Sequence, residues 1–261
     1  MSPIFRFHAG DTPLLISVPH DGRELPADMF ARMTAAGRAI PDTDWHVAKL
    51  YEFAVEMGAS TVMANYSRYV VDLNRAADDS ALYPGQLKTG LCPLQSFAGD
   101  ALYRSGNVER SEYEARVGTY WDPYHQHIRD TLDALRAKHG YALLWDAHSI
   151  SSIVPRLFDG ELPELNLGSN STMSCAERLE SAVARIVVES PYSSVINGRF
   201  KGGYITRNYG DPKNGIHALQ LEIAQRAYMD EKTLMFDDEK AKALGVTLRQ
   251  MLNAFQDAAK A

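Results

Sequence analysis

The chain has 261 residues, a formal net charge of −6 and a hydrophobic fraction of 45%. These values are ordinary for a globular protein, and the length allows one large domain or two small ones. The mildly acidic balance argues against a nucleic-acid-binding protein, which normally carries a basic surface.

The two cysteines, Cys92 and Cys175, stand far apart in the sequence and form no CxxC pair. They indicate neither a disulfide framework nor a cysteine-based zinc site, so a reducing cytoplasm is the expected compartment. Residues 1–10 lack a basic segment followed by an apolar core, and we expect no signal peptide and no transmembrane span. The expected protein is cytoplasmic and binds neither membrane nor nucleic acid, while the sequence leaves its oligomeric state unknown.

The first half of the chain predicts three strands and one helix. The apolar run at residues 14–18 lies between Pro13 and Pro19, which is typical of a short buried strand. Residues 44–57 carry apolar side chains at helical spacing. Residues 59–64 and 69–73 have the β-branched and apolar character of strands.

A turn-rich stretch follows at residues 78–107, with repeated glycine and proline. A loop of this length inside a compact domain is unusual, and such loops often act as lids or binding loops. We therefore expect a functional loop here.

The second half of the chain again alternates helices with strands. A helix is predicted over 111–139, with a break or kink near Pro123. The remaining predicted elements are a strand at 142–145, a helix at 174–188, strands at 193–197 and 217–223, and a helix from about 231 to the C-terminus. This order predicts an α/β sandwich, in which helices cover both faces of a central sheet, built as a single domain over residues 1–261.

Three polar residues, His20, His148 and Glu222, stand where predicted apolar strands stop. Ligands of open α/β sheets gather at the carboxyl ends of strands. One histidine in such a place is more often a structural residue. Two histidines with a carboxylate resemble a catalytic zinc site, which has three protein ligands and one open position.

The residues alone leave the third metal ligand open between Asp44, Asp42 and Glu24. The structural alternative for Asp42 or Asp44 is the N-cap of the helix predicted at 44–57, a position that aspartate commonly occupies. Asp146 stands two residues before His148, so both side chains lie on one face of a strand. It is a candidate to orient that ligand, with a buried structural carboxylate as the alternative.

Glu222 lies between Leu221 and Ile223, and an apolar setting raises the pKa of a carboxyl group toward that of a general base. A helix cap or an ion pair with Arg226 is the structural alternative. Basic residues form two candidate anion sites, one around Arg68, Asn74 and Arg75 and one in the segment 199–207, which contains Lys201 and Arg207. Arginine binds carboxylates through a planar, two-pronged contact.

Six segments in the same order resemble the N-formylglutamate amidohydrolase family over nearly the whole chain. They are SVPHDG at 17–22, DTDWHV at 42–47, YSRYVVDLNR at 66–75, WDAHS at 145–149, GGYITR at 202–207 and LQLEI at 219–223. The family is similar in turn to the zinc carboxypeptidases. The resemblance implies a three-layer sandwich with a central mixed sheet.

The resemblance also implies roles for residues of this chain. His20 and His148 would be the first and last ligands of Zn²⁺ or another divalent transition metal, and Glu222 the general base. Arg23 stands where the carboxypeptidase pattern has a glutamate ligand, so the middle ligand must come from elsewhere. The resemblance to the wider amidohydrolase family implies an aspartate at the position of Asp44, which is the expected middle ligand, with Glu24 as the alternative.

Asn74 and Arg75 would bind one carboxylate of the substrate, and Arg207, Arg68 or Lys201 would bind the other. The implied reaction is zinc-dependent hydrolysis of N-formylglutamate to formate and glutamate at the end of histidine degradation. Two alternatives remain: an amidase for another N-acyl amino acid, and a non-catalytic protein that binds acidic amino acids on the same scaffold.

Overall fold

A mixed sheet of seven strands forms the centre of the computed structural model, which describes residues 2–80 and 89–260. The strand order is β1-β3-β2-β4-β7-β5-β6. The four middle strands are parallel, whereas β1 and β5 run antiparallel to their inner neighbours. The strands are β1 (Phe5–His8), β2 (Leu14–Val18), β3 (Ser60–Ala64), β4 (Ala142–Ile150), β5 (Leu165–Gly168), β6 (Ser194–Ile196) and β7 (Ile216–Ala224).

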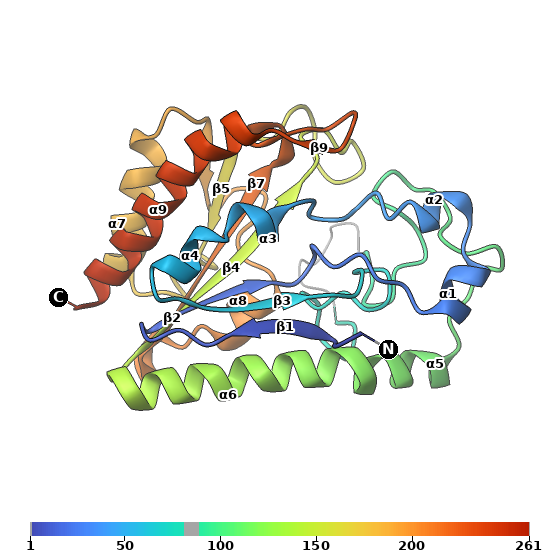
Figure 1. The fold of residues 1–261 in the computed structure, drawn as a ribbon, viewed down its shortest axis with the longest axis horizontal. Coiled ribbons are helices and arrows are strands. Elements are labelled where there is room, and N and C mark those ends of the chain that lie inside the picture. Colours follow the sequence, from blue (N-terminus) through green and yellow to red (C-terminus); the bar gives the residue numbers. More distant parts are fainter. Residues whose placement is uncertain (1, 81–88, 261) are drawn as a thin grey trace.

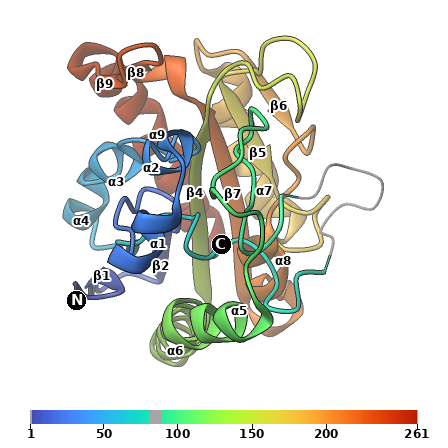
Figure 2. The same ribbon diagram turned by 90° about the vertical axis from the view of Figure 1, so that its right-hand side faces the viewer.

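Helices cover both faces of this sheet, which confirms the predicted three-layer sandwich (Figure 1). One face packs against α3 (Val47–Leu50), α4 (Phe53–Glu56), α7 (Glu177–Glu189) and α9 (Asp238–Lys260). The other face packs against α6 (Asp122–His139) and α8 (Tyr204–Tyr209). The short helices α1 (Ala27–Arg32) and α2 (Ala35–Arg38) lie at one end of the molecule, apart from α7 and α9 (Figure 1), and this end faces the viewer in Figure 2.

The two faces are separated by the alternation of side chains along the strands. Leu143 and Trp145 of β4 join the core under α7 and α9, while Ala142 and Leu144 join the core against α6. Successive side chains of a strand point to opposite faces, so a strand covered on both sides is apolar at every position. All nine residues of β4 are buried, including the polar ones near its carboxyl end.

Strands β4 and β7 are longer than predicted, and β4 contains Asp146 and His148, which were expected beyond its end. The prediction for 142–145 stopped at Trp145, but the ladder between the two strands continues through the pair His148 and Glu222 to Ile150. These polar side chains therefore project from regular sheet rather than from loops, and their spacing is that of the strand.

Two predicted elements differ in the structure. Residues 44–57 form two one-turn helices, α3 and α4, instead of one helix. The Asp21 carboxylate accepts the backbone N–H groups of His46 and Ala48, and α3 starts there. Residues 69–73 form turns instead of a strand. Their backbone bonds go to loops, as in the N–H of Asp72 that donates to Leu91 O, and burial alone explains their apolar character.

The final helix begins at Asp238, not near residue 231, because the chain first makes the short hairpin β8 (Met229–Asp230) and β9 (Met235–Phe236). The sequence analysis did not predict β1 and β5. Both are four-residue strands of the antiparallel pairs.

The helical region predicted to break near Pro123 is continuous but irregular. α5 (Arg110–Arg116) leads into a π-helical turn (Val117–Trp121), and α6 follows from Asp122. Proline lacks the N–H that would continue the α-helical pattern, and a π turn is one way to accommodate this loss.

The turn-rich stretch 78–107 includes residues 81–88, which lie outside the described residues, so its role as a lid remains a prediction. The described part is anchored to the rest of the fold. The N–H of Leu91 donates to Asp79 Oδ1, and the N–H of Phe97 donates to Asp42 Oδ2. Among the described residues, no helix combines the length and apolar character needed to cross a membrane.

His125 connects three parts of the fold. Its ring is fully buried on α6 and contacts Leu73 O at 2.9 Å and the Tyr209 hydroxyl at 2.8 Å. These bonds join α6 to α8 and to the turns that carry Asn74. Burial lowers the pKa of His125 to about 3, because an imidazolium would lose its hydration there.

We predict that His125 makes the protein less stable below neutral pH. The unfolded chain binds a proton near pH 6.5 and the folded chain only near pH 3, so the stability contribution is complete above pH 6.5 and is lost as the pH falls. For one such group, the free energy of unfolding decreases by up to about 1.4 kcal/mol per pH unit. Denaturant unfolding measured from pH 7 to 4 should show that the free energy of unfolding falls less steeply with falling pH in His125→Gln than in the wild type. The exposed His8→Gln serves as the control, and equal slopes in all three proteins would contradict the prediction.

Candidate metal centre and active site

The site lies at the carboxyl ends of the parallel strands β2, β4 and β7. His148 and Glu222 are paired neighbours on β4 and β7, as are Asp146 and Gln220 two residues earlier. Because the side-chain period of a strand is two residues, all four project from the same face of the sheet. This is the face packed against α8, and His20 reaches it from the loop that follows β2.

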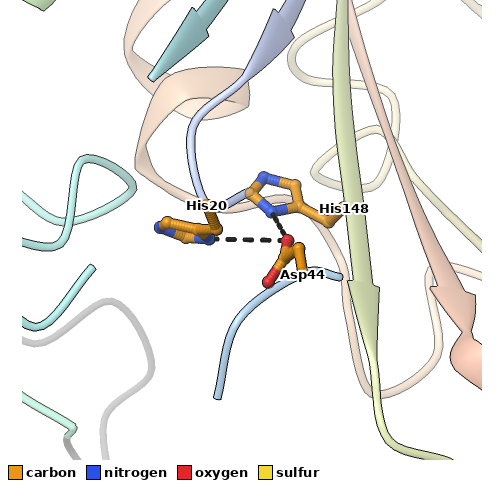
Figure 3. Close-up of side chains that lie close together, drawn as sticks. All are labelled: His20, Asp44 and His148. Atoms are coloured by element: carbon orange, nitrogen blue, oxygen red, sulfur yellow. Dashed lines mark hydrogen bonds and ion pairs between the residues drawn. The ribbon is translucent and has the colours of Figure 1, made fainter. Parts of the chain in front are cut away.

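His20, Asp44 and His148 converge at the centre of the site (Figure 3). Asp44 Oδ2 lies 3.0 Å from His148 Nδ1 and 3.7 Å from His20 Nδ1. The backbone holds this arrangement, because the N–H of Asp44 donates to His20 O and the N–H of Ser149 donates to Asp44 Oδ2. All three side chains are buried.

Each histidine uses its far ring nitrogen to bind another carboxylate. His20 Nε2 lies 2.8 Å from Asp72 Oδ1, and His148 Nε2 lies 3.0 Å from Asp146 Oδ2. With a metal ion at the centre, these contacts would keep the hydrogen on Nε2 and leave the Nδ1 lone pair of each ring for the metal. Metal-binding histidines are oriented by carboxylates in this way.

Three observations fit this centre to a divalent metal ion. First, His20 Nδ1 is buried and has no hydrogen-bond partner among the described residues. Second, the 3.0 and 3.7 Å separations bracket the roughly 3.3 Å expected between two ligands of a tetrahedral Zn²⁺. Third, Asp44, Asp72 and Asp146 are almost completely buried. Buried carboxylates need cationic partners, and a metal ion would supply two further positive charges.

Asp44 is the carboxylate that the structure brings to the two histidines. Burial raises its pKa, but His20 and His148 outweigh burial and bring the pKa below its ordinary value. Of the alternatives, Asp42 accepts the N–H of Phe97, and Glu24 pairs through its backbone with Tyr66 and Asn65. Neither alternative belongs to the metal-binding group found among the described residues.

Glu222 lies beside the centre in a buried position, with 7% of its surface exposed. Burial raises its pKa to about 8, since the attraction of His148 and Arg68 only partly offsets burial and the repulsion of Asp44. Its carboxylate accepts a bond from Gln220 Nε2 at 3.3 Å. A carboxyl group with a pKa in this range is suited to exchange protons near neutral pH.

One pocket is lined by His20 and His148 of the centre, by Glu222 and by three arginines, Arg68, Arg75 and Arg199. Arg68 is buried and donates to Asp44 Oδ1 and Asp72 Oδ2, so its charge already balances two carboxylates. Arg75 is half-buried and donates to Asn74 O and to Thr89 Oγ1. Among the described residues, no carboxylate forms an ion pair with Arg75.

Asn74 lines the pocket but is also part of its supporting structure. Its Oδ1 accepts the N–H of Ile205, and its Nδ2 lies 2.9 Å from His148 Nε2 and 3.4 Å from Asp146 Oδ2. A Cβ atom at Gly203 would lie 2.1 Å from Asn74 Nδ2. Glycine is therefore required at this position for α8 to approach Asn74 so closely.

The two other predicted basic residues do not line this pocket. Arg207 donates from Nε to Gly202 O at 2.8 Å, and Lys201 is exposed. The residues that form the pocket wall beyond the polar centre are Thr89, Phe97, Ile150, Leu157, Arg199 and Phe200.

The sequence analysis gave no separate role to Asp72 and Gln220, although both belong to matched segments. Asp72 binds His20 and Arg68 together. Burial raises its pKa, but the positive charge of Arg68, helped by the bond to His20, outweighs burial and holds the pKa well below the ordinary value. Gln220 connects Glu222 to the N–H of Gly203. The signal for Gln220 was its spacing of two residues from Glu222, the same spacing that identified Asp146 beside His148.

Fold and site together define a three-layer α/β protein with a buried His–Asp–His centre suited to a divalent metal ion. The sequence profile described as N-formylglutamate amidohydrolase matches residues 12–229. The chain belongs to the N-formylglutamate amidohydrolase family.

Named relatives cover almost the whole chain. N-formylglutamate deformylases of Pseudomonas aeruginosa and Pseudomonas putida are each 48% identical over 260 residues, which is 97% of this chain and 96% of theirs. The crystal structure of an N-formylglutamate amidohydrolase from Ralstonia eutropha JMP134 superposes with a TM-score of 0.81 at 25% identity, covering 96% of each chain.

We predict that Asp44→Asn abolishes metal binding, because it removes the carboxylate shared by both Nδ1 atoms. Elemental analysis after dialysis should find about one divalent ion per wild-type chain and only traces in the variant. Asp42→Asn and Glu24→Gln are matched controls and should keep the wild-type content. Thermal unfolding must show that each variant is folded. Metal retained by folded Asp44→Asn but lost from Glu24→Gln would reverse the assignment.

Proposed function

We propose that this protein is a zinc-dependent amidohydrolase that converts N-formyl-L-glutamate and water to formate and L-glutamate. The observation that carries the proposal is that one pocket is lined by Glu222, by Arg75 and by both histidines of the His20–Asp44–His148 centre. The names of the two Pseudomonas relatives support the substrate.

The donor set favours zinc among divalent metals. Two imidazole nitrogens and one carboxylate oxygen match a catalytic Zn²⁺ site, which keeps a position for water or substrate. When bound, Zn²⁺ supplies Lewis-acid chemistry, polarising a carbonyl group and lowering the pKa of water to about 7. His20, Asp44 and His148 are the residues that would hold it.

Glu222 is the proposed proton carrier. Its carboxylate takes a proton from the attacking water and passes it to the nitrogen of the amide as the C–N bond breaks. This role suits a carboxyl group whose pKa is raised to about 8. Gln220 donates to the Glu222 carboxylate at 3.3 Å and so helps to orient it.

Arg75 and Asn74 are the proposed partners of the substrate α-carboxylate. Arg75 lines the pocket with an orientation set by its bonds to Asn74 O and Thr89 Oγ1. A guanidinium binds a carboxylate through two parallel hydrogen bonds, which fixes both position and direction. Asn74 lines the pocket beside Arg75 and contributes by holding α8 and Asp146 in place, since its Oδ1 accepts the N–H of Ile205 and its Nδ2 donates to Asp146 Oδ2.

Arg68, Arg207 and Lys201 were the residues predicted for the second substrate carboxylate. Arg68 remains close enough to influence a bound anion, although its own bonds go to Asp44 and Asp72.

We further propose that the protein consists of one domain, acts in the cytoplasm and has a small anionic substrate as its partner. Its reaction is proposed as the last step of histidine degradation. Both cysteines are free thiols, which agrees with a reducing compartment.

Formate release is the direct test of the substrate. The purified protein should release formate from N-formylglutamate at least tenfold more efficiently than it deacylates N-acetylglutamate or N-formylaspartate. The reason is that the pocket must match both the acyl group and the side-chain length. Enzymatic measurement of formate and amino acid gives kcat/KM for each substrate. A preference for either of the other two substrates would assign the protein to a different amidase reaction.

We predict that Glu222→Gln lowers kcat about 10²-fold or more, because the side-chain amide that replaces the carboxylate cannot accept a proton from the attacking water. Metal content should stay at the wild-type level, since Glu222 is not one of the three grouped metal-binding residues. Glu161→Gln removes an exposed carboxylate that pairs with Arg226 and serves as the control. Wild-type turnover in folded, metal-loaded Glu222→Gln would assign the proton transfer to another group.

A further inference from the structure

The pocket contains one arginine that the assignments above leave without a role. Arg199 lies in the segment between β6 and α8 and lines the same pocket as Glu222 and Arg75. It comes two residues before Lys201, in the basic segment where the second anion partner was expected. Lys201 and Arg207 do not line the pocket, whereas Arg199 does.

The surroundings of Arg199 set its orientation. Its Nε–H donates to Leu157 O at 2.8 Å, and its guanidinium carbon lies 5.4 Å from the centre of the Phe200 ring. The backbone bond fixes the plane of the guanidinium group. An arginine held in one orientation at a pocket wall is suited to a planar, bidentate contact with a carboxylate.

The rest of this wall is apolar, as a substrate with a methylene chain requires. Leu157, Phe200, Phe97 and Ile150 line the pocket beside Arg199. Apolar walls bind methylene groups and exclude water, and an ion pair formed in their presence is stronger than one in open solvent. The wall thus combines an anion-binding group with a surface for a short aliphatic chain.

The other two arginines of the pocket are less suited to this task. Arg68 pairs with Asp44 and Asp72, and moving it to a substrate would leave those buried carboxylates unbalanced. Arg75 is bound to Asn74 O and Thr89, on the segment that supports His148. A substrate with two carboxylates needs two cationic partners, and Arg75 and Arg199 come from separate parts of the wall.

We propose that Arg199 binds the side-chain carboxylate of the substrate and so determines the selectivity for acidic N-acyl amino acids. This inference rests on the proposed function and adds to it the residue that reads the side chain. Arg75 then recognises the α-carboxylate, which every N-acyl amino acid carries, and Arg199 recognises the group that distinguishes glutamate from glutamine.

The test compares N-formyl-L-glutamate with N-formyl-L-glutamine, which has almost the same shape without the charge. For Arg199→Gln, kcat/KM for the glutamate substrate should fall about 10²-fold or more, because the charge-assisted pair is lost. For the glutamine substrate it should change less than about threefold. Arg75→Gln should lower both values by similar factors, because both substrates carry the α-carboxylate.

Two further variants complete the design. Arg185→Gln makes the same substitution at an exposed position on α7 and should match the wild type. Arg199→Lys keeps the charge without the planar fork and should retain part of the preference, which also covers the case of a Gln variant that fails to fold. Thermal unfolding and metal content establish that each variant is intact.

The outcomes separate the two proposals. If the wild-type protein releases formate from neither substrate, the proposed function fails, and the inference fails with it. If the wild type is active, but folded Arg199→Gln keeps the preference for glutamate or loses both activities equally, the inference alone is overturned. Selective loss of the glutamate substrate supports it.

Discussion

The buried carboxylates around His20 and His148 are the constraint on which the site depends. Asp44, Asp72 and Asp146 lie almost completely out of water, and Arg68 balances two of them. Such a concentration of negative charge is unfavourable in a protein interior unless cations are close. The arrangement orients both histidine rings through Nε2, directs both Nδ1 atoms to Asp44, and gives a divalent cation a favourable position. The stability of the centre and its affinity for metal therefore have the same origin.

The geometry of the sheet supplies the precision that this centre needs. The pairing of β4 with β7 places His148 beside Glu222 and Asp146 beside Gln220, and the alternation of side chains puts all four on one face. A one-residue slip of either strand would move its polar pair into the core under α7 and α9. The apolar residues at the alternate positions thus determine the register, and the register places Glu222 beside His148.

The pocket is completed by segments without regular structure. The turns at 66–75 carry Arg68, Asp72 and Asn74, and glycine at 203 lets α8 approach Asn74. His125 stabilises these turns from behind by binding Leu73 O. Loops that carry binding residues on a rigid sheet are a common arrangement in enzymes. Here the sheet positions His148 and Glu222, and the loops position His20, Asp44 and the three arginines of the pocket.

The sequence by itself determined the alternation of strands and helices, the two histidines, and the pairs Asp146–His148 and Asn74–Arg75, because these follow from local periodicity and motif order. It did not determine that residues 69–73 are turns, since buried turns and buried strands are equally apolar. The residues alone left the third ligand open, and the resemblance favoured Asp44. The tertiary structure brings Asp44, and not Asp42 or Glu24, to the two histidines, through contacts between segments more than 100 residues apart, as in the pair of Asp44 with His148. The sequence likewise indicated the basic segment 199–207, but which of its basic residues lines the pocket depends on the packing of this segment against Leu157.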